Sequence, residues 1–333
     1  MKKSSNNIKD YLSKNSPKFK IHSLTIIKTN KNKINKDLLN EVENKKMIKY
    51  ENGEYYIGSV LNNKPNGKGV LYYKEGNIKY EGDFINGKYE GKGKYIYEDG
   101  KYYIGEFINN LRQGKGILYY KEGNIMYEGD FLGGKAEGNG KLIFENGEYY
   151  IGQFKNGLKH GKGKLYNNNG DIIYEGDFIN DKAEGNGKII YEGGKFYIGQ
   201  FKEGIKHGKG ILFNNNGDII YEGDFVDDKA EGYGKIFYED GEYYLGEFKN
   251  NLSHGKGILY YKDGNVKYEG DFIKDKYEGI GKLIYEDGEY YVGQFKNGLK
   301  HGKGIYYFSD GNIKYEGNFF FGNIEGDIIN FTI

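Results

Sequence analysis

Four histidines stand at the same place in a repeated segment and are the first candidates for chemistry. They are His160, His207, His254 and His301, which are spaced 47 residues apart, and each is followed by Gly-Lys-Gly. Histidine is a common metal ligand and acid–base group. Zinc ligands lie within about 2.1 Å of the ion, whereas four strands per interval would separate successive histidines by about 19 Å. Because Asn66 and Gln113 occupy the equivalent positions, we predict a hydrogen-bonding role instead.

Glutamates occupy this position in the intervening repeats. They are Glu90, Glu137, Glu184, Glu231, Glu278 and Glu325. Two strands would place each glutamate about 10 Å from the neighbouring histidine-type residue. That distance is too long for direct pairing and wide for catalysis by paired carboxylates. We interpret the row as a repeated polar edge.

One glycine-rich segment partly matches a phosphate-binding loop. Residues 82–88 read Gly-Asp-Phe-Ile-Asn-Gly-Lys, but Tyr89 follows where the loop needs Ser or Thr to bind magnesium. No helix is expected to follow, and the spacing recurs at residues 129–136. The segments before Asp171 and Asp218 lack the alternating oxygen ligands of a calcium loop. Since the chain also has no cysteine, we predict no catalytic residue, metal site or cofactor.

The most regular residues are those that must position everything else. A tyrosine, taken as position 0, recurs at alternating steps of 24 and 23 residues, with glycines at +2, +11, +13 and +20. Phenylalanine stands at +4, except for Val60 in the first copy. Residues 0, +2 and +4 share a face only in a strand. The tyrosines are Tyr56, Tyr80, Tyr103, Tyr127, Tyr150, Tyr174, Tyr197, Tyr221, Tyr244, Tyr268, Tyr291 and Tyr315.

The four copies that resemble one another most define a structural signature. Glycine in a strand leaves room for a ring or a neighbouring backbone. We therefore expect Tyr and Phe rings of adjacent repeats to lie over the glycines and form ladders along one face. The signature residues are Tyr150, Gly152, Phe154, Gly161, Gly163, Tyr197, Gly199, Phe201, Gly208, Gly210, Tyr244, Gly246, Phe248, Gly255, Gly257, Tyr291, Gly293, Phe295, Gly302 and Gly304.

Turn residues separate the strands. Segments such as Lys155–Gly157 supply the positive φ angles of tight hairpins. Gly-Lys-Gly then opens a second strand, for example Lys164–Tyr166. Another turn, such as Glu98–Gly100, ends the second strand. Each repeat is thus one β-hairpin, and twelve would span about 110 Å. The predicted fold is all-β, an elongated single-sheet solenoid of antiparallel hairpins.

The pattern Tyr-x-Gly-x-Phe, Asn-Gly, His-Gly-Lys-Gly closely resembles the membrane occupation and recognition nexus (MORN) repeat. The resemblance covers about 290 of the 333 residues. The family commonly has Trp at +4, where this chain has Phe, and one repeat of each pair carries an extra residue. The resemblance implies an elongated sheet with roles in scaffolding, protein–protein contact, dimerisation and attachment to phospholipid membranes.

Residues 1–43 differ from the array of residues 44–333. Ten lysines and four acidic residues give them a net charge of +6, which leaves −5 for the array out of the chain's +1. Ile34, Leu38 and Val42 predict a short amphipathic helix near residues 34–46, and residues 18–28 could form a strand. This segment is either a solvated tail with an N-terminal cap or a basic arm attracted to acidic lipid or protein.

Composition and charge pattern argue against several classes of protein. Glycine (55) and tyrosine (36) are abundant, as in repetitive chains. The sequence shows no secretory signal and no apolar window of about 20 residues. Lysines alternate with acids, whereas single-stranded nucleic acid needs a basic groove. We therefore predict no nucleic-acid binding and a cytoplasmic chain, associated with a membrane or the cytoskeleton in some settings.

The predicted function is a non-enzymatic scaffold or adaptor that binds protein partners through the repetitive array. A peripheral organiser on anionic phospholipid membranes is the alternative, with lysines contributing roughly 1 kcal/mol each near the surface. A second alternative is a regulatory partner of an enzyme acting in trans. Unpaired edges at residues 44–50 and 327–333 also allow a homodimer or end-to-end association.

Overall fold

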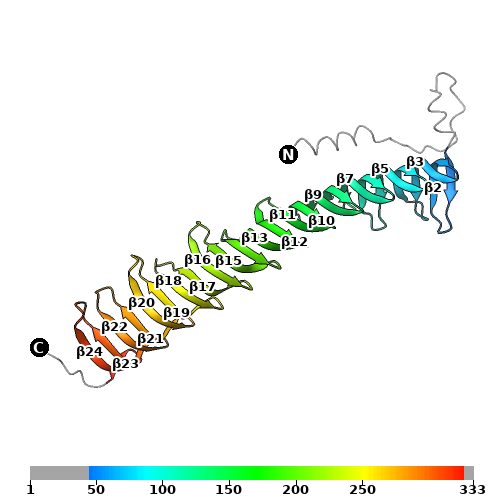
Figure 1. Cartoon of the computed structure of the whole chain (residues 1–333). Helices are drawn as coiled ribbons and strands as arrows, with labels where there is room; N and C mark the ends of the chain where they lie inside the picture. The colour runs from blue at the N-terminus through cyan, green and yellow to red at the C-terminus, as the bar shows by residue number, and fades with distance from the viewer. Residues whose placement is uncertain (1–44, 326–333) are drawn as a thin grey trace.

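A single antiparallel sheet forms the whole described part of the chain. This computed structural model describes residues 45–325, which contain 25 strands and no helix. Each strand pairs with the next in chain order, so the sheet grows into a long twisted rod (Figure 1). The predicted all-β hairpin solenoid is confirmed. The predicted helix near residues 34–46 and strand at 18–28 lie outside the described residues, except that Lys46 begins β1.

The strands are β1 (Lys46–Lys49), β2 (Tyr55–Leu61), β3 (Lys64–Tyr72), β4 (Ile78–Ile85), β5 (Lys88–Ile96), β6 (Tyr102–Ile108), β7 (Leu111–Tyr119), β8 (Ile125–Leu132), β9 (Lys135–Ile143), β10 (Tyr149–Lys155), β11 (Leu158–Tyr166), β12 (Ile172–Ile179), β13 (Lys182–Ile190), β14 (Phe196–Lys202), β15 (Ile205–Phe213), β16 (Ile219–Val226), β17 (Lys229–Phe237), β18 (Tyr243–Lys249), β19 (Leu252–Tyr260), β20 (Val266–Ile273), β21 (Lys276–Ile284), β22 (Tyr290–Lys296), β23 (Leu299–Tyr307), β24 (Ile313–Phe320) and β25 (Asn323–Glu325).

Two-residue turns join the strands of each hairpin. Between β10 and β11, Asn156 and Gly157 have φ angles of 53° and 89°, which suit the right-handed twist of the strands. Lys155 pairs with Leu158 directly across the turn. The prediction that Gly-Lys-Gly opens the second strand was wrong, because so short a turn lets pairing resume at Leu158, before that element.

The three signature glycines serve different purposes. Gly152 pairs with Gly163, but Gln153 pairs with His160, so β11 carries a bulge at Gly161 and Lys162. Gly161 has a φ of 62°, a backbone conformation that suits glycine. The glycine at +11 therefore permits the bulge, and only those at +2 and +13 make room for a ring.

The ring in that room comes from the same repeat. A Cβ atom on Gly152 or Gly163 would overlap the ring of Tyr150, which is fully buried. The expectation that adjacent repeats supply this ring was wrong. The tyrosine stands two residues before the first glycine on the same strand face, so its own side chain folds across the gap.

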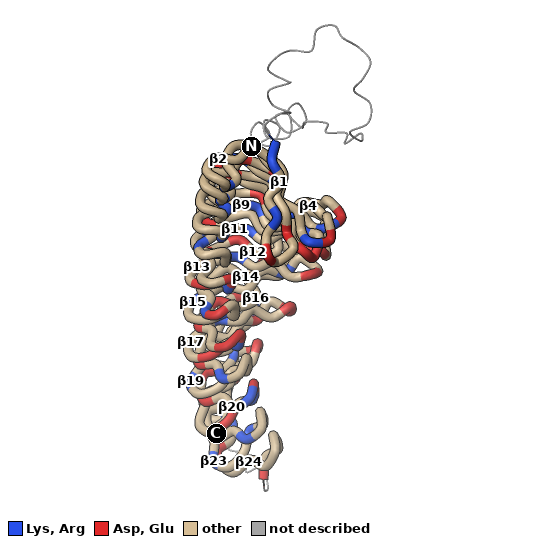
Figure 2. Tube along the Cα trace, turned by 90° about the vertical axis from the view of Figure 1, so that its right-hand side faces the viewer, with Lys and Arg blue, Asp and Glu red and all other residues tan. Residues whose placement is uncertain are grey.

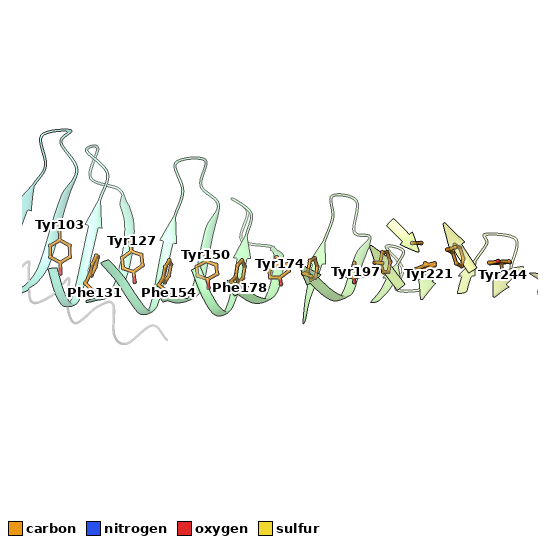
Figure 3. Close-up of a cluster of buried hydrophobic side chains, with 14 of the residues drawn as sticks. Tyr103, Tyr127, Phe131, Tyr150, Phe154, Tyr174, Phe178, Tyr197, Tyr221 and Tyr244 are labelled. Carbon is orange, nitrogen blue, oxygen red and sulfur yellow. The ribbon is translucent and has the colours of Figure 1, made fainter. Parts of the chain in front are cut away.

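Phenylalanine joins one repeat to the next. The Phe154 ring meets Tyr127 of the preceding repeat at 5.0 Å and Tyr150 of its own at 5.2 Å, both edge to face. Phe178 meets Tyr150 at 5.1 Å and continues the series. Figure 3 shows these rings in one row along the sheet. We call this row of tyrosines at 0 and phenylalanines at +4 the aromatic spine; its side of the sheet is the spine face, and the other side is the opposite face.

Candidate functional site

The position most variable in chemistry on the spine face is +9, directly across the hairpin from the spine phenylalanine. Phe154 pairs with Lys159, whose Nζ lies 5.7 Å from the Phe178 ring and 5.9 Å from Tyr150. Lys300 lies similarly over four rings, and burial together with nearby Lys314 lowers its pKa. A row of half-buried cations therefore sits on aromatic rings, an arrangement worth about 0.5–2 kcal/mol per contact.

A large hollow opens on the spine face near the N-terminal end of the array. Its volume is about 1080 Å³. One wall is the turn at residues 50–54, and the other consists of the turns near Gly87, Asn110 and Gly134. Its floor is largely apolar and contains Leu71, Phe84, Tyr89 and Tyr95. A concave site of this size with an apolar floor can bury apolar groups of a bound molecule.

A smaller hollow of about 260 Å³ continues along the same face, and Arg112 and Gly134 line both. Its floor holds Ala136, Leu118 and Leu142. Ala136 occupies the +9 position, where Tyr89 stands in the preceding pair of repeats and stacks on Tyr80 at 4.0 Å. The alanine therefore leaves open a space that a tyrosine fills elsewhere in the same fold.

The opposite face satisfies its own charges. Lys162 pairs with Asp177 at 2.7 Å, and Tyr149 stacks on Tyr166 at 4.5 Å beneath the Lys141 ammonium. Basic and acidic residues accompany one another along the rod (Figure 2). Pairs equivalent to Lys162–Asp177 are Lys68–Asp83, Lys115–Asp130, Lys209–Asp224 and Lys256–Asp271. This face thus offers few unmatched charges to a partner.

The row at +10 links each repeat to the next turn. Glu137 Oε2 accepts a hydrogen bond of 2.8 Å from the Asn156 amide, and Gln113 Oε1 accepts one from Gly133. The predicted polar edge is confirmed for Glu137, and the predicted hydrogen-bonding role is confirmed for Gln113. For three histidines of the row the predicted hydrogen bond is not found at Nδ1, which is buried without a partner in His160, His207 and His301.

The signature tyrosines are structural. The Tyr150 hydroxyl donates to the Gln153 carbonyl oxygen at 3.0 Å, and Tyr197 donates likewise to Gln200. Burial raises the pKa of Tyr150 and of Tyr197 to about 12. These hydroxyls therefore hold the strand rather than exchange protons near neutral pH. Within residues 45–325, no three His, Asp or Glu side chains gather to hold a metal ion.

Sequence reasoning missed the +9 row and both hollows. The signal was present in the sequence, because Ala136, Ala183 and Ala230 alternate with Arg112, Lys159 and Lys206 at successive +9 positions.

No helix in the described residues is long and apolar enough to cross a membrane.

Comparison with known proteins gave a short match to a curated protein and matches to solved structures, among them the following two. A stretch of 60 residues is 45% identical to the "Inactive protein tyrosine kinase pTKL" of Plasmodium berghei (strain Anka), covering 17% of this chain and 4% of that protein. The TCP10 domain of Danio rerio CPAP (E1021V mutant) is 12% identical with a TM-score of 0.20, over 76% of this chain and 96% of that one. A Bacteroides caccae protein of unknown function is 10% identical with a TM-score of 0.16, over 76% and 90%.

The MORN repeat family accounts for most of the array. Its profile matches eleven segments: 56–78, 80–102, 103–125, 127–149, 150–172, 174–195, 197–219, 221–243, 244–266, 268–290 and 291–313. The twelfth hairpin, which begins at Tyr315, falls outside the match; Ile328 stands at its +13 position in place of glycine. Each matched segment begins at a spine tyrosine, so the family's repeat and the structural repeat coincide. The chain belongs to the MORN repeat family.

Proposed function

We propose that this chain is a non-enzymatic scaffold that binds protein partners along its spine face. The observation that carries the proposal is the pair of adjoining hollows, about 1080 and 260 Å³, on a face with an apolar floor. The opposite face, by contrast, pairs its charges internally. Family membership and a continuous repeat sheet are also not typical of enzymes.

Partners of the spine face must bind through side chains. Each strand from β2 to β24 is hydrogen-bonded to a neighbour on both sides, so within residues 45–325 strand addition is available only at β1 and β25. A helix, about 10 Å across with its side chains, is a partner that keeps its own backbone bonds satisfied. We therefore propose that the partner lies lengthwise over the spine face as a helix.

Nucleic acid is a poor match for this surface. Binding of single strands requires a basic groove lined by stacking aromatics. Here the spine rings are buried, and the net charge of the whole chain is +1. The scaffold proposal therefore involves protein surfaces and no nucleic acid.

The test fills the smaller hollow without disturbing the fold. Ala136→Tyr places on β9 the side chain that Tyr89 already presents on β5. Ile151→Tyr is the matched control, because Ile151 is exposed on the opposite face of β10. Each purified variant and the unaltered chain are used to capture proteins from the cells that make this chain, after circular dichroism has verified folding.

We expect Ala136→Tyr to reduce recovery of specific partners by about tenfold, the equivalent of about 1.4 kcal/mol, while Ile151→Tyr leaves recovery unchanged. Equal recovery by all three proteins would remove the spine face as the binding surface. Loss only with Ile151→Tyr would transfer the site to the opposite face.

A membrane role is the second candidate, favoured by the ten lysines of residues 1–43. In that case the chain would act as a cytoplasmic organiser at an anionic membrane. Flotation with phosphatidylserine vesicles, compared between the full chain and one beginning at Asn44, tests this role. Binding that disappears without residues 1–43 supports it, and no binding by either protein eliminates it.

Self-association through the sheet ends is a further part of the proposal. β1 and β25 each have one unpaired edge among the described residues. A second copy could extend the sheet there. Light scattering across a range of protein concentrations would show growth beyond the monomer mass, whereas a constant monomer mass would contradict it.

A further inference from the structure

The larger hollow at the N-terminal end lies beside a segment of the same chain that fits it. We infer that residues 34–43 dock as a short helix in the 1080 Å³ hollow and cover its apolar floor. The docked segment would leave the smaller hollow around Ala136, farther along the rod, as the part of the spine face open to a protein partner.

The position of the hollow makes this segment its nearest candidate. Lys49, Tyr50, Glu51 and Glu54 line it, and they lie at the end of β1 or in the turn that follows. Residues 34–43 stand just before β1, which begins at Lys46. A short tether keeps the segment at an effective concentration in the millimolar range, so even modest contacts suffice for docking.

The length and apolar pattern of residues 34–43 match the floor of the larger hollow. The floor of the hollow reaches from Leu71 on β3 to Arg112 on β7, which is four strand spacings or about 19 Å. A helix of residues 34–43 would be about 15 Å long. Its stripe of Ile34, Leu38 and Val42 would cover the apolar floor formed by Leu71, Tyr89 and Tyr95. Removal of these apolar side chains from water would favour docking.

The charge of residues 34–43 also matches that of the hollow, although residues 1–43 as a whole are basic. Residues 34–43 carry Asp37, Glu41 and Glu43 against Lys36. On a helix, Asp37 and Glu41 form a row along one side of the apolar stripe. The hollow holds Arg112, the single arginine of the chain.

Arg112 has no carboxylate partner among residues 45–325. Its guanidinium donates to the Gly134 carbonyl oxygen and lies 4.9 Å from the Phe131 ring. Lys79 in the same hollow is already paired with Glu54 at 2.6 Å. Arginine binds carboxylates through a planar fork of donors, so a carboxylate of the docked helix would complete its coordination.

Crosslinking within the full chain tests the docking, since the chain has no native cysteine. Asn40→Cys with Leu111→Cys places one thiol on the segment and one on the rim of the hollow. Asn40→Cys with Leu299→Cys is the control, because Leu299 is the equivalent residue of β23 near the other end and is similarly exposed, at 45% against 51%. A short bismaleimide is added at low protein concentration, and the monomeric crosslink is followed over time.

We expect the 40–111 crosslink to form at least about tenfold faster than the 40–299 crosslink. Adding Leu38→Asp, which places a charge in the apolar stripe, should reduce the 40–111 rate to the control rate. Equal rates for the two pairs, mainly dimeric products, or a 40–111 rate unaffected by Leu38→Asp would each overturn the inference. Loss of the scaffold's partners with Ala136→Tyr is a separate outcome that this experiment does not affect.

Discussion

Replacing Gly163 by alanine tests the reason for the repeated glycines. The new Cβ would overlap the Tyr150 ring. That ring cannot move aside, because Phe154 and Phe178 hold it at 5.2 and 5.1 Å. Overpacking of a tight interior costs about 1–3 kcal/mol. A fully buried ring lies on one side of the new Cβ, and the paired backbone of Gly152 lies on the other. We therefore expect the free energy of local opening to fall by an amount near the upper end of this range, about 3 kcal/mol.

Gly204→Ala is the matched control. Gly204 lies in a hairpin turn with a φ of 93°, and no atom lies within 4 Å of its Cβ position. Only backbone strain is expected, about 1–2 kcal/mol. Because repeat arrays open in parts rather than all at once, native-state hydrogen exchange is the suitable measurement, with the free energy of local opening as its readout. The amides of β10 and β11 report on Gly163→Ala, and those of β14 and β15 report on Gly204→Ala.

A double variant separates the ring clash from other effects. If the clash is with Tyr150, Tyr150→Leu should make Gly163→Ala less costly, with a coupling of about 0.5–3 kcal/mol. Purely additive losses would refute the clash, and so would equal losses for Gly163→Ala and Gly204→Ala.

Three further predictions concern the same repeats. The pKa values of Tyr150 and Tyr197 are raised to about 12 from about 10 in the unfolded chain, so stability should hold below pH 10 and fall between pH 10 and 12; circular dichroism unchanged to pH 12 would contradict this. Glu184→Ala removes the acceptor of the Glu203 amide, bonded at 2.9 Å, and should weaken that turn by about 1 kcal/mol, measured by hydrogen exchange of the Glu203 amide. Lys162→Ala breaks an exposed ion pair and should lower the free energy of unfolding, measured in urea, by less than about 1 kcal/mol; a larger loss would show that the opposite face stabilises the rod.

The sequence was sufficient for the hairpin array because its determinants are local. Tyr150, Gly152 and Phe154 share a face only in a strand, and Asn156-Gly157 adopts the positive φ angles of a two-residue turn. Both features depend on neighbouring residues and recur in every unit. Periodicity therefore predicted the strands, the turns and the single sheet before any contact was known.

The contacts across strands were harder to predict. The bulge at Gly161 shifts the pairing between β10 and β11, and this shift decides which ring covers Gly163. Spacing alone does not distinguish a glycine that permits a bulge from one that makes room for a ring. The source of the ring was therefore predicted incorrectly, although the need for one was correct.

The candidate binding face could not be predicted from the sequence, for a different reason. A hollow depends on how high the turns near Asn52, Gly87 and Gly134 rise beside the floor. That height follows from the twist and curvature of the whole sheet. The alternation of Ala136 with Arg112 and Lys159 was visible in the sequence, but its meaning required knowing that position +9 lies on the spine face.

Hydroxyl-radical footprinting of the chain bound to a captured partner most directly tests whether the spine face is the binding surface. The method reads side-chain exposure, so it can distinguish the two faces of one sheet. We expect oxidation of Leu118 and Leu142, which line the smaller hollow, to fall on binding while that of Ile151 stays constant. Protection of Ile151 with Leu118 and Leu142 unchanged would contradict binding along the spine face.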